Sequence, residues 1–323
     1  MKRIKILTYG VLLVTIGFLG VCYFANNAYP SDLNERKEID TILSQLNDPN
    51  WRVRDGALCR LIELPPYPGR WQVREEYRND ERVRTALINL FIHEVEHQHE
   101  PCPNGEIKGE EYAEYESALA QSVVSLKDKR PLPYFLKYGC YDYIRDYIVE
   151  VGDESVVRER LKDLENIDPV YPVRTELSIE ILGRMVKKEE GYIPTGTTRE
   201  EIKQAIVRTL KQCKHIEIDK SDPYSELNSS SQAWIRLRTI QSLGNFADPS
   251  LIPIIRPYLN DPYSETREKT ELRQEGKKAT VVTVGKVTIY PVREEAQRVL
   301  KLLEEKKKQQ NEQKGKIDKI NKE

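Results

Sequence analysis

The sequence lacks an excess of charge of either sign. Its 51 Lys and Arg residues nearly cancel its 52 Asp and Glu residues, leaving a net charge of −1 over 323 residues. A nucleic-acid binder needs surplus cations to displace the counterions of phosphate, so that class is excluded. An acidic, disordered domain is excluded as well. Charged residues of mixed sign still make up 32% of the chain, which is typical of long helices with solvated faces.

The signatures of common enzymes are missing too. The chain has no G-x-S-x-G, no Walker loop and no G-x-G-x-x-G. Its five cysteines form no C-x-x-C, which argues against a zinc ribbon or a thioredoxin-type site. We therefore expect neither a cofactor nor a small-molecule substrate. In an exported chain Cys102 and Cys140 are the candidate disulfide pair, because both lie in loop-like sequence.

One long hydrophobic run opens the chain. It extends from Ile6 to Ala25 without a charge, and cationic residues precede it. A helix of that length spans about 30 Å, the hydrocarbon thickness of a bilayer. Because the cations lie before the run and none follows closely, the N-terminus is expected in the cytoplasm and the rest of the chain outside it. The sequence predicts an uncleaved membrane anchor within residues 1–28 and a periplasmic or cell-surface body.

Two other fates of this segment stay open. Leu19-Gly20-Val21-Cys22 resembles the lipobox of lipoproteins, in which Cys22 is lipidated, although Val21 stands where that motif has Gly, Ala or Ser. A cleaved signal peptide needs small residues at −3 and −1 of the cut, and residues 23–28 offer no good A-x-A pair. The uncleaved anchor needs no special residue and ranks first.

A short motif recurs along the rest of the chain. In its first copy Asp48-Pro49 is followed by Val53-Arg54, Ala57 and Leu61. Apolar residues at this spacing line one stripe of a helix, while Asp-Pro ends one helix and caps the next. A single helix pair cannot bury its apolar face alone, so such pairs stack. The other copies are Asp168-Pro169 with Val173-Arg174, Leu177 and Ile181; Asp80 with Val83-Arg84 and Leu87; and Val292-Arg293 with Ala296 and Leu300.

Together with Leu243-Gly244, Asp248-Pro249 and Ile252-Pro253, this motif resembles the HEAT repeat, particularly the bacterial HEAT-like type named after phycobilisome lyases. The resemblance covers most of residues 35–306, in about five or six irregular repeats. It implies an all-α, armadillo-like solenoid with a concave face for partner binding, and it does not imply an enzyme. The repeats are expected over residues 29–260, with a last repeat helix at 291–306.

Residues 261–290 interrupt the last repeat. They contain two β-rich runs on either side of Gly285, which predict a β-hairpin around that glycine. A lone hairpin is marginally stable in water, so it is expected to dock on the helices or on a partner. Residues 307–323 form a polar tail, rich in Lys and Gln, that reads as a fraying helix or as disorder.

One stretch has the pattern of a catalytic site. His93-Glu94-Val95-Glu96-His97 reads H-E-x-x-H, the signature of zincin metallopeptidases. On a helix, His93 and His97 would share a zinc ion and Glu94 would activate its water as general base. Against this, Glu96 is charged where zincins are not, and no G-x-x-H follows. We therefore expect no catalytic residue and no metal, and keep a zinc peptidase as the alternative.

Tyrosine is over-represented, with 18 copies. Tyrosine suits contact surfaces because it offers a large area at low entropic cost, although it also fills gaps between irregular repeats. The candidate partner-binding residues are Tyr141, Tyr143, Tyr147 and, in a proline-rich loop, Trp71.

The sequence as a whole predicts a membrane-anchored HEAT-type solenoid that acts as a non-catalytic protein-interaction scaffold. Its expected partners are another protein and, through residues 6–25, the membrane. A zinc metallopeptidase and a structural envelope protein remain the alternatives.

Overall fold

The chain is mostly helical, as predicted, and forms two compact units that meet in sequence at Tyr134 and Phe135. The computed structural model describes residues 32–64, 69–97, 109–138, 141–165, 173–213, 225–275 and 278–320. Among the helices of these ranges, none combines the length and hydrophobicity that crossing a bilayer requires. The predicted anchor, the lipidation candidate Cys22, and the pair Cys102 and Cys140 lie outside the described residues, so they stay predictions.

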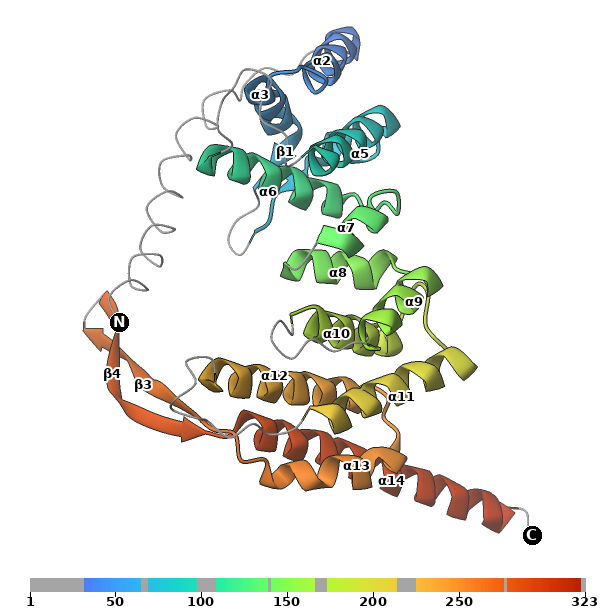
Figure 1. Ribbon diagram of the computed structural model, residues 1–323. Coiled ribbons are helices and arrows are strands. Elements are labelled where there is room, and N and C mark those ends of the chain that lie inside the picture. The colour runs from blue at the N-terminus through green and yellow to red at the C-terminus, as the bar shows by residue number, and fades with distance from the viewer. Residues whose placement is uncertain are drawn as a thin grey trace. The chain divides into compact units, whose positions relative to one another are not determined.

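The first unit is a set of helices packed against their near neighbours in sequence (Figure 1). Helix α3 contacts α2 and α6, and α5 contacts α6. A short antiparallel pair, β1 (Ile62–Glu63) with β2 (Gln72–Val73), joins the chain on either side of the proline-rich loop. The helices are α2 (Asp32–Gln45), α3 (Trp51–Leu61), α4 (Glu75–Arg78), α5 (Glu81–Glu96), α6 (Glu110–Ser125) and α7 (Leu132–Tyr138), the last of which crosses the unit boundary.

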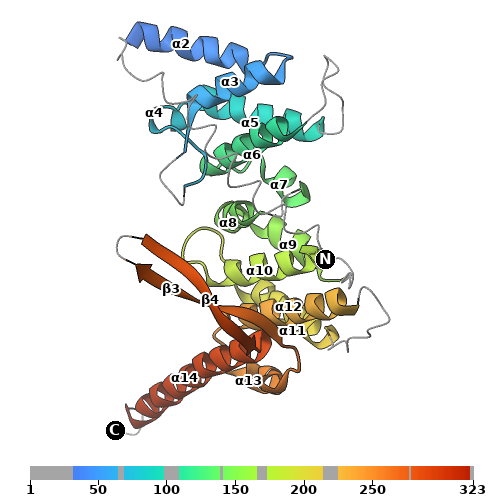
Figure 2. The ribbon, with the colours of Figure 1, turned by 90° about the vertical axis from the view of Figure 1, so that its left-hand side faces the viewer.

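The second unit consists of helices, and a β-hairpin is inserted directly before the last of them (Figure 2). Helix α10 contacts α8, α9 and α12, and α12 also contacts α11 and α14. The elements are α8 (Asp142–Val151), α9 (Glu154–Asp163), α10 (Val173–Lys187), α11 (Gly196–Gln212), α12 (Ser225–Gly244), η3 (Pro249–Leu251), α13 (Ile252–Ile255), η4 (Arg256–Asn260), β3 (Glu265–Glu275), β4 (Lys278–Ile289) and α14 (Pro291–Ile320).

The apolar stripe of the recurring motif forms the core of both units. In α3 the residues Ala57 and Leu61 are buried, and in α14 Val292, Ala296 and Leu300 are buried. Each helix therefore covers its neighbour with the residues that the spacing predicts. Two valines that open the motif are not fully buried: Val53 in α3 is half-buried, and Val173, the first residue of α10, is 60% exposed.

The arginine of the motif has a structural task that recurs. Arg54 donates through Nη1 to the carbonyls of Asp48 and Pro49, at 2.7 and 3.0 Å. Arg84 donates to the carbonyl of Arg78 at 3.3 Å. In the last copy Arg293 donates to the carbonyl of Asp261. Carbonyls beyond a helix end lack partners within the helix, so a guanidinium that reaches back satisfies them and fixes the turn.

The hairpin is present, but its strands differ from the predicted ones. The two runs around Gly285 form the single strand β4, which pairs antiparallel with the charged strand β3. Gly285 lies within β4 opposite Lys269, next to an irregularity of register between Lys269 and Thr270. A glycine inside a strand is typical of such a bulge, so the turn predicted at Gly285 is wrong.

The last helix continues past residue 306, in keeping with the fraying helix that was one of the two expectations for the tail. Helix α14 extends from Pro291 to Ile320 and so includes most of the polar tail expected to begin at 307. Its side chains from Glu304 to Ile317 are all exposed, and Glu304 forms an exposed ion pair with Arg256 at 3.2 Å. Lys, Glu and Gln are good helix formers, and they continue the helix beyond the core residue Leu303.

Candidate functional site

The H-E-x-x-H motif occupies the end of α5, where its members separate onto different faces. His93 is exposed and His97 half-exposed, whereas Glu94 is only 5% exposed. Val83, Leu87 and Leu90 are buried on the same helix, so Glu94 continues the core-facing stripe. The spacing of these four residues is that of one stripe on a helix, and the structure buries all four.

Glu94 is held in a buried polar cluster. Arg54 forms an ion pair with it, with Nη2 at 2.6 Å and Nε at 2.8 Å from Oε1. The hydroxyl of Tyr112 donates to Oε2 at 2.7 Å, and that of Tyr115 donates to Oε1 at 2.8 Å. Trp51 packs on both tyrosine rings, with centroids 5.5 and 5.9 Å away.

The electrostatics of this cluster keep the two tyrosines protonated. Burial, together with the neighbouring Glu94 carboxylate, raises the pKa of Tyr112 and of Tyr115 well above the usual range. Desolvation opposes the charge of Arg54, but its hydrogen bonds and the nearby Glu94 and Tyr115 more than compensate, and its pKa is raised. The cluster is therefore a complete hydrogen-bond network around one buried carboxylate.

The direction of the Glu94 side chain bears on the zinc-peptidase alternative. Both of its carboxylate oxygens accept hydrogen bonds from Arg54, Tyr112 or Tyr115. A base that activates a metal-bound water must face the metal, and here the histidines lie on the exposed side while Glu94 points inward. Within the described residues, no group of three His, Cys, Asp or Glu side chains is arranged to hold a metal ion.

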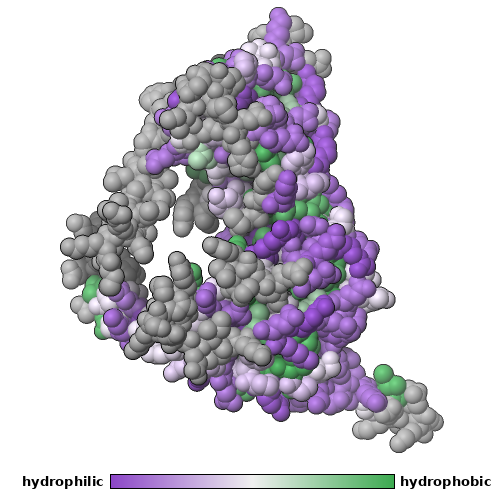
Figure 3. Space-filling view, viewed as in Figure 1, coloured by the Kyte–Doolittle hydropathy of each residue, from purple (hydrophilic) through white to green (hydrophobic). Residues whose placement is uncertain are grey.

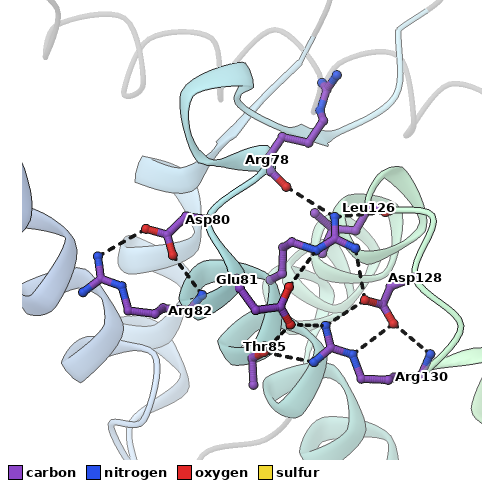
Figure 4. A network of polar contacts seen from close by, with 9 residues as sticks. Arg78, Asp80, Glu81, Arg82, Thr85, Leu126, Asp128 and Arg130 are labelled. Carbon is purple, nitrogen blue, oxygen red and sulfur yellow. Dashed lines mark hydrogen bonds and ion pairs between the residues drawn. The ribbon is translucent and has the colours of Figure 1, made fainter.

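A second polar network joins the start of α5 to the turn after α6 (Figure 4). Asp128 accepts from Arg84 at 3.1 Å and from Arg130 at 2.7 Å, and Arg130 also reaches Glu81 at 3.0 Å. Hydrogen bonds from Arg130, with further ones from Arg84, hold the pKa of Asp128 well below its usual range. Since every charged group in the network has an opposite partner, it serves to fasten two turns of the first unit.

The predicted partner-binding tyrosines separate into two kinds. Tyr141 is 62% exposed and stacks on Tyr143, with ring centroids 5.6 Å apart and planes 7° apart. Tyr147 is only 1% exposed and packs edge-on against Phe135. Tyr147 is thus a core residue and cannot contact a partner, which corrects that assignment. It lies on the buried stripe of α8 with Ile144 and Ile148.

Trp71, the fourth candidate, stands beside the β1–β2 pair. Its side chain is half-buried, and its backbone N–H donates to Gln121 Oε1 on α6 at 2.9 Å. The backbone N–H of Val73, the second residue of β2, donates to Ser125 Oγ at 3.1 Å. The end of the proline-rich loop is therefore fastened to α6.

The base of the hairpin is anchored by charged and aromatic contacts. Asp261 forms a buried, bidentate ion pair with Arg236 of α12, at 2.7 and 3.0 Å. Arg293 of α14 donates to the Asp261 carbonyl and lies over the ring of Tyr290, 4.2 Å from its centroid. Asp261 and Arg293 are 32 positions apart in sequence but in contact in the structure. The two ends of the insertion therefore lie next to each other.

Beyond its base the hairpin is exposed. Figures 1 and 2 show it reaching past the helices of its unit. The side chains of residues 283–288 are exposed, including Val284 at 38% and Val287 at 43%. By contrast, Figure 3 shows a mostly hydrophilic described surface with small, scattered hydrophobic groups. Within the described part of the chain the sheet contains β3 and β4 alone, so neither strand has a second neighbour.

Two of these features were not predicted from the sequence: the contact of Arg54 with Glu94, and strand β3. Arg54 had been placed in the repeat motif, but nothing local connects it with Glu94, which lies 40 positions away. Strand β3 was missed because its alternating charges resemble a solvated helix. The signal that was available is Gly276-Lys277, a Gly-X pair typical of two-residue hairpin loops.

The comparisons with known proteins add no identity. No family model, no curated protein and no solved structure matches this chain.

Proposed function

We propose that this chain is a non-catalytic scaffold that binds another protein, and that the hairpin β3–β4 is its recognition element. In this proposal the helices form a solenoid of HEAT-like pairs, and the hairpin is an insertion presented by the last pair. The observation that carries the proposal is an exposed two-stranded sheet with apolar residues at Val284 and Val287. A two-stranded hairpin is marginally stable by itself, so a partner that covers it gains binding energy and stabilises it.

The chemistry of the two strands indicates which edge is used. Strand β3 carries alternating charges, which protect an edge against pairing with other chains. Strand β4 is rich in Val and Thr and carries few charges. An extended segment of the partner would add along β4 by main-chain hydrogen bonds, with apolar side chains meeting Val284 and Val287. The anchored base holds the hairpin in place for this.

The test is site-specific photo-crosslinking in the native organism. A photoreactive residue at Val287 should give one discrete adduct with a partner, and the same residue at the exposed helical position Arg208 should not. Replacing residues 266–288 with a short Gly-Ser linker should abolish co-purification of the partner identified in that adduct, while leaving the helical circular dichroism of the remaining chain in place. Equal capture without the hairpin would contradict the proposal and place recognition on the helices.

A single substitution sharpens this test. Val287→Lys adds a charge to the β4 edge and should weaken partner binding at least tenfold, because a lysine on an edge opposes strand addition. Gln309→Lys adds the same charge at an exposed position of α14 and serves as the matched control. If both variants bind as the parent does, β4 is not the contact.

We propose further that residues 6–25 anchor the protein and that the body is extracytoplasmic. The support is the uncharged run with its preceding cations. Protease added to intact spheroplasts should degrade the body in this orientation. If the body is degraded only after the membrane is opened, the orientation is the opposite one, with the body in the cytoplasm. Metabolic labelling with palmitate should leave the chain unlabelled for an uncleaved anchor, and a label that Cys22→Ser removes would instead favour the lipoprotein.

A further inference from the structure

The end of α5 presents two imidazole rings side by side at the surface. The ring centroids of His93 and His97 are 4.3 Å apart and their planes are inclined by 34°. The helix is 16 residues long, and the pair lies in its last turn and at its C-cap. Residues four apart on a helix share a face, so both rings project from the same side.

A hydrogen bond selects the tautomer of one ring. Nδ1 of His97 lies 2.8 Å from the carbonyl oxygen of His93. A carbonyl oxygen only accepts, so Nδ1 must be the donor, and in the neutral ring Nε2 then carries the lone pair. Histidines that bind metals commonly have this arrangement, in which the second ring nitrogen donates to a carbonyl and fixes the ring.

The surroundings favour a cation. The C-terminal end of a helix carries a partial negative charge from its last carbonyls, which stabilises positive charge there. Glu96 is exposed in the same turn and accepts a hydrogen bond from Tyr134 at 2.8 Å. The carboxylate of Glu94, in contrast, is occupied in the buried cluster on the other side of the helix.

We propose that His93 and His97 form a two-histidine chelate for a late first-row divalent ion, with Zn²⁺ and Cu²⁺ as the fitting class. Imidazole nitrogen is a preferred ligand of these ions. A zinc ion bound to both rings at about 2.0–2.1 Å holds its two nitrogens roughly 3.4 Å apart. Rings with centroids 4.3 Å apart reach that spacing by small rotations of their side chains. Water or an external donor fills the remaining positions.

In this proposal the two histidines of the motif bind a metal ion, while Glu94 takes no part in binding or hydrolysis. A zincin needs the Glu beside its metal, whereas Glu94 here completes the core of the first unit. The site is therefore a surface chelate without a general base of its own. It is also independent of the hairpin, because it uses another element of the chain.

The experiment is titration of the full, untagged chain with Zn²⁺ alone by calorimetry, and with Cu²⁺ by electron paramagnetic resonance. The parent should bind one ion with two nitrogen ligands. His93→Ala and His97→Ala should each weaken binding at least tenfold, and His215→Ala, which removes a histidine outside the pair, should not. Both substituted side chains are at least partly exposed, so these variants are expected to fold.

Binding by His93→Ala and His97→Ala equal to that of the parent would overturn the proposal, as would no binding by the parent. A third variant, Glu94→Gln, separates the two interpretations of the motif. It should keep the metal affinity of the parent, because Glu94 is not near the ion in this proposal. A metal-dependent peptidase activity that Glu94→Gln abolishes would overturn the assignment of a chelate without catalysis.

Discussion

At the scale of single residues, buried charge organises the first unit. The Glu94 carboxylate is enclosed with Arg54, Tyr112 and Tyr115, and each of its oxygens accepts a hydrogen bond. Such a carboxylate is stable only while its partners remain, since an isolated buried charge has lost its hydration. The cluster joins α3, α5 and α6, so its loss affects all three helices.

We expect Arg54→Leu to lower the free energy of unfolding of the first unit by about 3–5 kcal/mol, because it leaves Glu94 charged and unpaired in the core. The matched control is Arg52→Leu. Its ion pair with Glu111 is exposed, at 2.6 Å, and its loss should cost no more than about 1 kcal/mol. The free energies of unfolding of both variants are measured by urea titration, with fluorescence as the signal, in a chain that retains Trp51 as its only tryptophan. Equal effects of the two substitutions would show that the buried cluster does not stabilise the unit.

The Asp128 network predicts a dependence on pH. Hydrogen bonds from Arg130 and Arg84 hold the pKa of Asp128 below its unfolded value of about 3.9. Its contribution to stability is therefore complete above that unfolded pKa and is lost as the pH falls toward the folded one. Asp128→Asn should lower the free energy of unfolding by about 1–3 kcal/mol at neutral pH. The difference from the parent should shrink steadily in urea titrations below about pH 4.

The control for this substitution is Asp40→Asn, whose partner Arg82 is exposed like Asp40 itself. It should change stability by less than about 1 kcal/mol. A constant difference between Asp128→Asn and the parent across the acidic range would contradict the electrostatic account and leave only a steric effect.

At the scale of elements, the glycines of two helices have opposite roles. Gly183 of α10 lies against α12, and a Cβ there would be 2.4 Å from Ser242 Oγ and 3.0 Å from Ser242 Cα. Gly315 lies in the exposed end of α14, where a Cβ would meet no atom within 4 Å. The first glycine permits close helix packing, while the second only lowers helix propensity.

Alanine at these two positions should therefore act in opposite directions. Gly183→Ala should destabilise the second unit by about 1–3 kcal/mol, because α10 and α12 must move apart. Gly315→Ala should stabilise the end of α14 by about 0.5–1 kcal/mol. Thermal unfolding measures the first, and amide hydrogen exchange along α14 measures the second. A stabilising Gly183→Ala would mean that the helices are not in close contact there.

At the scale of the whole molecule, each unit has a core of its own. Contacts within the units join helices that are near in sequence, and repeat-like arrays of this kind lose strict two-state unfolding as they lengthen. Two of the three tryptophans, Trp51 and Trp71, belong to the first unit, and Trp234 belongs to the second.

We therefore expect two unfolding transitions. A variant that retains Trp234 alone and one that retains Trp51 alone should report different urea midpoints by fluorescence. Adding Arg54→Leu should lower the Trp51 midpoint and leave the Trp234 midpoint in place. Coincident midpoints that shift together would show that the chain unfolds as one cooperative block.

The sequence alone determined the helical class and most of the core. The spacing of Ala57 and Leu61, or of Val292, Ala296 and Leu300, decides which side of a helix is apolar, and the structure buries those residues. The recurring motif also located the insertion before α14. These features follow from local periodicity and turn chemistry, which neighbouring residues specify among themselves.

Tertiary structure decided what each polar residue does. The H-E-x-x-H pattern is compatible with a catalytic helix, and only the packing of α3 and α6 on α5 places Arg54 and two tyrosines around Glu94. Tyr141 and Tyr147 differ by six positions, yet one is exposed and the other is in the core. Strand β3 likewise becomes a strand because β4 pairs with it. Such outcomes depend on partners distant in sequence, whose position no local pattern records.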